Sequence, residues 1–120
     1  MTPTPDTYRS LTQAVSGQLA SLRSSTPEVM KAFSDLGRAA TAPGALDQKT
    51  KELIALALSV AVRCDPCIGF HTQALVKLGA TRQEVDEALG VATYMGGGPS
   101  LMYAASAVAS FDEFAGAAKR

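Results

Sequence analysis

Helix-start signals recur along this chain, and no segment shows the sustained polar-apolar alternation of a half-buried strand. Thr26-Pro27 and Asp65-Pro66 each place a capping side chain before a proline suited to a first helical turn. Thr81 and Glu84 have the spacing of a capping box, and Asp47 can cap a further helix. These signals predict an all-α fold, a bundle of five to six helices with no sheet.

Apolar positions that recur about every 3.6 residues indicate where the helices lie. The expected segments are 7–25, 27–40, 47–63, 65–79, 81–96 and 101–120. We expect the second to end near Gly37 and the fourth at Gly79, because glycine adopts the left-handed conformation that closes many helices. The glycine-rich residues 96–100 are expected to break the chain between the last two helices.

The most apolar segment is LIALALSVAV, residues 53–62, which is apolar on nearly every side of a helix. It is about half the length needed to span a bilayer, so we expect it to be buried within the domain or against another subunit. The sequence therefore predicts a homo-oligomer. Tyr94, Met102 and Tyr103 are expected to belong to the core, or to line a small apolar pocket near the cysteines.

Length and charge limit the classes of function. A chain of 120 residues is expected to form one domain, 1–120. Its 11 basic and 11 acidic residues balance without a run of like charge, which argues against a nucleic-acid or membrane partner. The first residues lack the charged and apolar regions of a signal peptide, so a cytoplasmic location is expected.

The segment RCDPCIGFH, residues 63–71, holds both cysteines and the only histidine. With Pro66 at the first helical position, Cys67 lies in the first turn, and His71 follows it by four residues on the same face. A helix N-terminus and a nearby imidazole both favour the thiolate, which is the reactive form. Cys64 can then attack an oxidised Cys67, so the segment predicts a redox site.

Other interpretations of these residues remain open. Free cysteines are often small buried hydrophobes, and a single histidine is often structural. A structural zinc ion takes four ligands, and Cys64, Cys67 and His71 supply only three, so a carboxylate or another subunit would have to complete the site. We predict no metal and no cofactor. Two cysteines are too few for a disulfide framework and fit a reducing compartment.

The spacing of Glu52, Cys64, Cys67 and His71 resembles the AhpD-like alkylhydroperoxidase branch of the carboxymuconolactone decarboxylase superfamily. The matching text is KELIALALSVAVRCDPCIGFHTQALVKLGATRQEVDEAL, and the resemblance covers roughly residues 45–110. It implies an all-helical protein that forms trimers or hexamers and reduces a hydroperoxide. It also implies that Cys67 attacks, that Cys64 resolves, and that Glu52 and His71 relay protons. A dithiol, such as a lipoyl group, would be the reductant.

The resemblance leaves several alternatives. Some members carry a histidine between the cysteines, where this chain has Pro66. Lactone decarboxylases of the superfamily as a rule lack the cysteine pair. Glu52 by itself fits equally well as a first-turn acid that favours the helix dipole or as a partner of a nearby lysine. Two other functions would use the same residues differently. One is redox sensing or chaperone-like activity without turnover, and the other is a metal-stabilised or purely structural oligomer.

Overall fold

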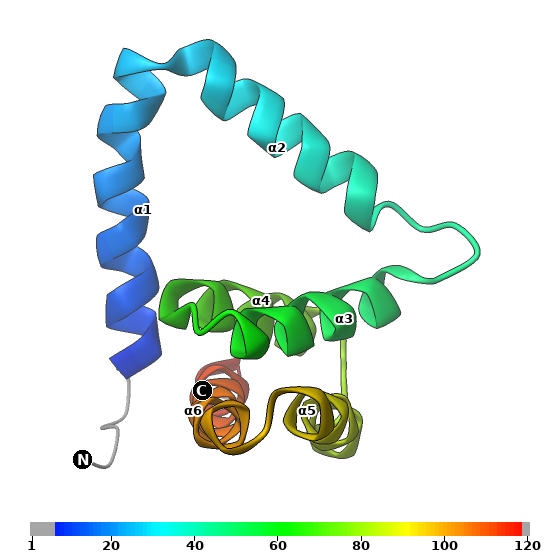
Figure 1. The fold of residues 1–120 in the computed structure, drawn as a ribbon. Helices are drawn as coiled ribbons and strands as arrows, with labels where there is room; N and C mark the ends of the chain where they lie inside the picture. Colours follow the sequence, from blue (N-terminus) through cyan, green and yellow to red (C-terminus); the bar gives the residue numbers. More distant parts are fainter. Residues whose placement is uncertain (1–6, 119–120) are drawn as a thin grey trace.

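The computed structural model describes residues 7–118, and over that range the chain forms six α-helices and no strand (Figure 1). The helices are α1 (Thr7–Ser25), α2 (Pro27–Thr41), α3 (Gln48–Ala61), α4 (Asp65–Lys77), α5 (Arg82–Gly96) and α6 (Gly98–Ala118). The predicted all-α bundle is confirmed. None of these helices is both long enough and apolar enough to cross a membrane.

Two predicted boundaries were wrong. Helix α2 continues through Gly37 to Thr41, because a single glycine inside a helix lowers its stability by only about 1 kcal/mol and does not end it. The expected break over residues 96–100 is a single residue, Gly97, whose φ of 73° lies in the left-handed region. Pro99 falls in the first turn of α6, where proline is tolerated because those backbone N–H groups have no intrahelical partner.

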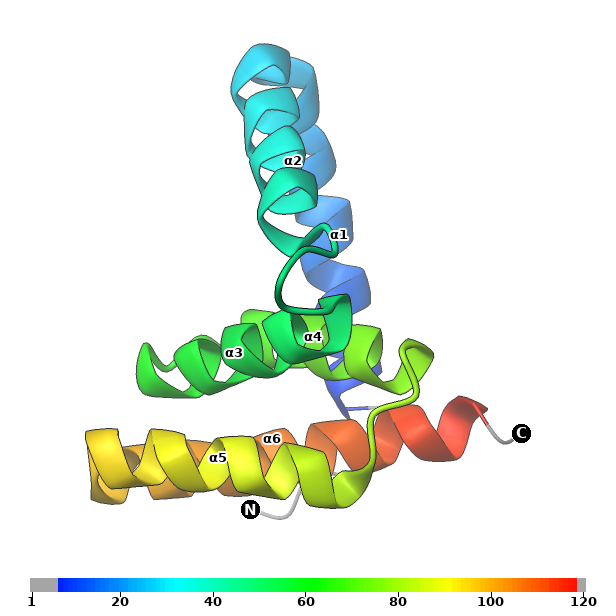
Figure 2. The ribbon, with the colours of Figure 1, turned by 90° about the vertical axis from the view of Figure 1, so that its right-hand side faces the viewer.

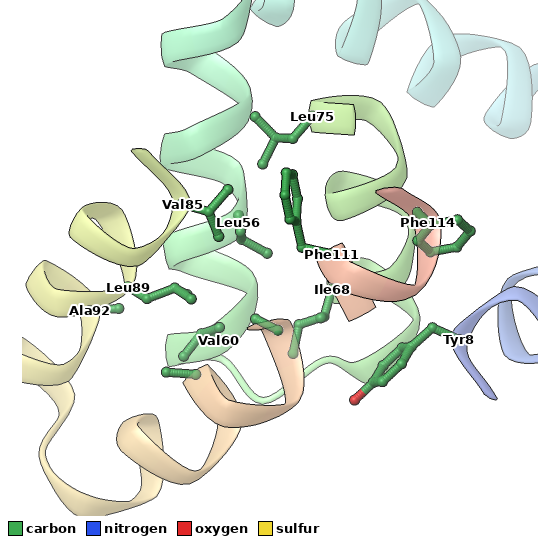
Figure 3. Packing of buried hydrophobic residues seen from close by; sticks show 12 residues of the cluster. Tyr8, Leu56, Val60, Ile68, Leu75, Val85, Leu89, Ala92, Phe111 and Phe114 are labelled. Carbon is green, nitrogen blue, oxygen red and sulfur yellow. The ribbon is translucent and has the colours of Figure 1, made fainter. Parts of the chain in front are cut away.

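The helices form two layers, with α3 and α4 stacked on α5 and α6 (Figures 1 and 2). Figure 3 shows side chains from all four helices meeting between the layers. The fully buried apolar side chains there are Leu56, Val60, Ile68, Leu75, Val85 and Ala107. Burial of this apolar surface is the main force that holds α3 against α4, and it fixes the distance between the residues that these two helices carry.

The base of α1 is held by a carboxylate on α6. Glu113 accepts hydrogen bonds from the backbone N–H groups of Tyr8 at 3.0 Å and Arg9 at 2.8 Å. These are first-turn donors that the helix itself cannot satisfy. Tyr8 is buried, and this burial raises the pKa of its phenol. A Cβ on Gly69 would lie 2.6 Å from a methyl group of Thr12, so glycine permits the close approach of α1 to α4.

Above this base, the rest of α1 and all of α2 extend away from the two layers (Figure 2). No residue of α2 is buried. Its apolar side chains Val29, Phe33 and Leu36 are 66%, 71% and 63% exposed. An amphipathic helix whose apolar stripe faces water is typical of a surface that another chain covers.

The apolar helix α3 is only partly covered. Leu56 and Val60 are fully buried, whereas Ile54, Leu58 and Val62 form an outer stripe with 46–70% exposure. The expected burial of this helix is therefore only partly met within one chain, and burial against another subunit stays a prediction. The buried faces of α3 are those that pack against α4, α5 and α6, and α2 touches this helix only slightly.

The expectation that Tyr94 and Met102 belong to the core was wrong. Their side chains are 84% and 63% exposed, because they lie on the outer faces of α5 and α6 near the Gly97 turn. Tyr103 is half-buried and packs against the core.

Replacing Glu113 with alanine is expected to lower the free energy of unfolding by about 1–2 kcal/mol, the usual cost of losing a helix cap. The loss should appear as faster amide hydrogen exchange in α1 and a lower urea midpoint. Glu87→Ala is the control, since Glu87 is an exposed carboxylate whose side chain bonds only Gln83 on the same helix. Equal stability of the two variants would contradict the capping role of Glu113.

We expect the protein to be oligomeric in solution, with the exposed stripe of α2 at an interface. Phe33→Glu should shift the population towards monomers, because it places a charge in an apolar contact. Ser34→Glu adds the same charge at the next exposed position of α2 and should leave the assembly intact. Light scattering measures both, and a parent protein that is monomeric at micromolar concentration would contradict the expectation.

Candidate functional site

Cys64 is the residue that begins α4. It is the N-cap, and its Sγ accepts a hydrogen bond from the backbone N–H of Cys67 at 3.3 Å. Its carbonyl oxygen accepts the N–H of Ile68 at 3.0 Å. The prediction that Asp65 caps this helix was wrong by one residue, because the sulfur of Cys64 occupies the place that a capping oxygen usually takes. Asp65 lies inside the first turn.

The same cysteine also closes α3. The backbone N–H of Cys64 donates to the carbonyl of Ser59 at 3.0 Å, and that of Arg63 donates to Val60 at 3.2 Å. This pair of bonds is the Schellman motif, which requires a left-handed residue just after the helix. Arg63 is that residue, with a φ of 61°. Only three residues, 62–64, connect α3 to α4, and Cys64 takes part in the caps of both helices.

Cys64 and Cys67 form a disulfide in this structure, with their Cα atoms 5.2 Å apart. That separation lies within the usual range for disulfides. Both residues are half-buried at the start of α4. The two sulfurs that the sequence places three residues apart are thus close enough to be joined, and they remain partly open to solvent.

His71 lies one helical turn after Cys67 and is paired with Glu52 of α3. The His71 Nδ1 and Glu52 Oε2 atoms are 2.6 Å apart. The Glu52 side chain is only 11% exposed and that of His71 is 32% exposed. A carboxylate on Nδ1 places the proton of a neutral imidazole on that nitrogen and leaves Nε2 as the acceptor.

The structure does not pair Glu52 with a lysine. Lys49 bonds to Glu84 at 2.8 Å, and Lys51 bonds to the backbone carbonyl of Ala42 at 2.7 Å. Glu52 is instead on the buried side of α3, where a carboxylate needs a hydrogen-bond partner. The sequence left open whether Glu52 favours the helix dipole, pairs with a lysine or belongs to the site. The structure shows it in contact with His71.

The four predicted residues therefore meet at the interface of α3 and α4. Glu52 reaches across from α3, while Cys64, Cys67 and His71 line the first two turns of α4. In the disulfide form Cys67 has no thiol proton, so proton transfer from Cys67 to His71 is possible only in the reduced form. Among residues 7–118 no group of three or more His, Cys, Asp or Glu side chains is arranged to hold a metal ion.

Sequence reasoning missed two features of this site: the capping role of the Cys64 sulfur and the left-handed backbone of Arg63. Neither residue type is usual in its position, since oxygen-bearing side chains lead at N-caps and glycine leads at left-handed helix ends. The one available signal was the short spacing between the end of the apolar run at Val62 and Pro66, which leaves three residues for the whole connection.

Comparison with known proteins places this geometry in a family. The model of the carboxymuconolactone decarboxylase family matches residues 27–110. The chain belongs to the carboxymuconolactone decarboxylase family. A family protein from Legionella pneumophila, solved in its apo form, has a TM-score of 0.90 and 59% identity, over 92% of this chain and 98% of its own.

Two further relatives are more distant. A family protein from Thermotoga maritima, for which a part in antioxidative response has been suggested, has a TM-score of 0.80 and 34% identity. That similarity covers 90% of this chain and 92% of the Thermotoga chain. An uncharacterised protein from Cupriavidus necator is 42% identical over 91% of this chain and 96% of its own length. Family membership thus extends over nearly the whole chain.

The capping role of Cys64 can be tested on the reduced protein. Cys64→Ser should keep the free energy of unfolding within about 0.5 kcal/mol of the reduced parent, because serine is a strong N-cap. Cys64→Ala should lower it by about 1 kcal/mol, since alanine accepts no hydrogen bond. Urea unfolding in the presence of a phosphine reductant measures both. If alanine is tolerated as well as serine, the sulfur does not act as a cap.

Proposed function

We propose that this protein is a thiol-dependent hydroperoxide reductase in which Cys64 and Cys67 cycle between dithiol and disulfide. The observation that carries the proposal is the disulfide at the N-terminus of α4 beside the Glu52–His71 pair. A thiol at a helix start near an imidazole, with a second thiol in reach, is the arrangement that peroxide reduction requires. The suggested antioxidative part of the Thermotoga relative supports the same class of activity.

The first step uses Cys67 as the nucleophile. His71 Nε2 takes the thiol proton, and the buried carboxylate of Glu52 stabilises the imidazolium that forms. The thiolate attacks the terminal oxygen of the hydroperoxide, and the O–O bond breaks. The alkoxide takes the proton from His71 and leaves as an alcohol, so that Cys67 becomes a sulfenic acid.

The second step uses Cys64 as the resolving thiol. Its sulfur attacks the sulfenic sulfur of Cys67, the S–S bond forms, and hydroxide leaves with the proton of Cys64 as water. Two thiols have then reduced one hydroperoxide to an alcohol and water. The role of Cys64 is supported by its N-cap position, where the N–H of Cys67 and the helix dipole stabilise a negatively charged sulfur.

The cycle closes with a dithiol reductant. Attack of its thiolate on the Cys67 sulfur breaks the disulfide and releases Cys64 as the thiolate, which leaves readily because the helix start stabilises it. The second thiol of the reductant then frees Cys67, so that the reductant carries away the disulfide. A lipoyl-type dithiol fits this requirement, since its two thiols close a ring within one molecule.

Neither rival activity has the same support. Lactone decarboxylation makes no use of a disulfide, and here the pair occupies the start of α4 beside the only histidine. A redox sensor would form the same disulfide but would not consume hydroperoxide beyond one equivalent. Turnover therefore separates an enzyme from a sensor.

The proposal predicts steady consumption of an alkyl hydroperoxide with dithiothreitol or dihydrolipoamide as the reductant. Cys67→Ser should lower the rate by about 10²-fold or more, because it removes the nucleophile. Cys64→Ser should also lose turnover, and mass spectrometry should find Cys67 carrying one added oxygen instead of a disulfide. Lys77→Gln is the control, a charge change at the far end of α4.

Two outcomes would count against this proposal. The absence of turnover in the parent with every dithiol tested would contradict enzymatic peroxide reduction. Accumulation of oxygen on Cys64 in the Cys67→Ser variant, with the opposite variant unreactive, would reverse the roles of the two cysteines.

A further inference from the structure

Arg63, the residue directly before Cys64, has a backbone conformation that side chains rarely adopt. Its φ of 61° is left-handed, and no other non-glycine residue between 7 and 118 has a positive φ. In this conformation the Cβ atom lies too close to the following carbonyl oxygen, a clash that glycine avoids. The end of α3 is therefore strained at the residue that joins it to the cysteine pair.

The end of α4 provides an internal comparison. There the N–H of Gly79 donates to Val76 at 3.1 Å and that of Ala80 donates to Leu75 at 3.0 Å. These two bonds have the same spacing as those that Arg63 and Cys64 donate at the end of α3. Gly79 has a φ of 76°, so this chain builds the same motif twice, once with glycine and once with arginine. The backbone geometry by itself favours glycine at residue 63.

Among the described residues, the side chain of Arg63 has no polar contact that offsets the strain. Arg63 is exposed, and its guanidinium forms no ion pair or hydrogen bond with the described residues, 7–118. One favourable interaction is available to any cation at this point, which is attraction to the C-terminal dipole of α3. That attraction would explain a positive charge at residue 63 without any role for the cysteines. It is the alternative hypothesis that the experiment has to exclude.

The charges around the cysteine pair point to a second reason for an arginine at residue 63. The elements packed around α4 carry ionisable groups of both signs, whereas residues 98–111 of α6 have no charged side chain. These groups are Lys49, Lys51 and Glu52 of α3, Asp65, His71 and Lys77 of α4, Tyr8, Arg9 and Arg23 of α1, and Tyr103, Asp112 and Glu113 of α6. A negative charge on Asp65, the residue after Cys64, disfavours a thiolate there, and a positive charge on the residue before it favours one. Arg63 is the cation bonded directly to Cys64.

We propose that Arg63 is a positioning residue that acts through Cys64, where its positive charge stabilises the thiolate of the reduced pair. The inference rests on the proposed redox function, and it adds a residue that sets how readily the disulfide opens. When an external dithiol attacks the Cys67 sulfur, the S–S bond breaks and its electron pair goes to Cys64. The guanidinium of Arg63 lowers the free energy of that leaving thiolate.

Variants at this position separate charge from backbone strain. Arg63→Gln removes the charge and keeps a side chain with the same left-handed strain. Arg63→Lys keeps both the charge and the strain, and Arg63→Gly removes both. Lys77→Gln removes a cation from the far end of α4 and serves as the control for net charge. Each reduced variant is alkylated with iodoacetamide over a pH series, and mass spectrometry resolves the rate at Cys64.

We expect Arg63→Gln to raise the pH of half-maximal alkylation of Cys64 by about half a unit. A shift of this size is what the loss of a nearby, partly screened positive charge produces. The rate at pH 7 should then fall about threefold. Arg63→Lys and Lys77→Gln should match the parent. Arg63→Gly should raise the pH midpoint as glutamine does, while its folded-to-unfolded ratio in urea rises about fivefold because the strain is relieved.

Two results would overturn the inference. If Arg63→Gln leaves the pH midpoint unchanged and only lowers stability, the charge serves the α3 dipole and not Cys64. If Arg63→Gly shifts the midpoint and Arg63→Gln does not, the backbone geometry matters and the charge does not. Failure of the parent to turn over hydroperoxide would leave these alkylation midpoints unaffected, so the proposed function and this inference fail separately.

Discussion

The geometry of this protein depends on the double use of Cys64 as the end of one helix and the start of the next. Its N–H completes the cap of α3 on Ser59, and its sulfur and carbonyl begin α4 by accepting from Cys67 and Ile68. A connection this short leaves little freedom in the angle between α3 and α4. The junction thus sets the direction in which α4 leaves α3, and packing of the apolar core then sets the distance between the two helices.

The contact between Glu52 and His71 is one consequence of the junction. A buried carboxylate is unfavourable without a partner, and the imidazole from the neighbouring helix supplies one at 2.6 Å. The contact also fixes the orientation of His71, with its second nitrogen free of Glu52. Core packing at Leu56, Ile68 and Leu75 keeps the two helices at the distance that this contact requires.

The exposed apolar surfaces lie on elements other than this core. The stripes on α2 and on the outer face of α3, together with Tyr94 and Met102, leave large apolar side chains in water, which is typical of an interface. The base of α1 is anchored through Glu113, whereas α2 contacts only α1 and α3 among the described helices. The chain therefore combines a packed layer that carries the cysteine pair with a helix, α2, that has little to bury against within one copy.

The sequence by itself determined the helical class and most of the helix limits, and it singled out the four residues of the candidate site. These are local properties, because periodicity, caps and the spacing of Cys67 and His71 act within a few residues. The pairing of Glu52 with His71 and the α3–α4 angle were decided by tertiary structure, since a buried carboxylate takes whichever partner packing brings within reach. The cap of α4 depends on the junction of the two helices, because Cys64 takes part in the ends of both. The sulfur of Cys64 occupies the position that capping preference alone assigned to Asp65, and the backbone N–H of the same residue closes α3.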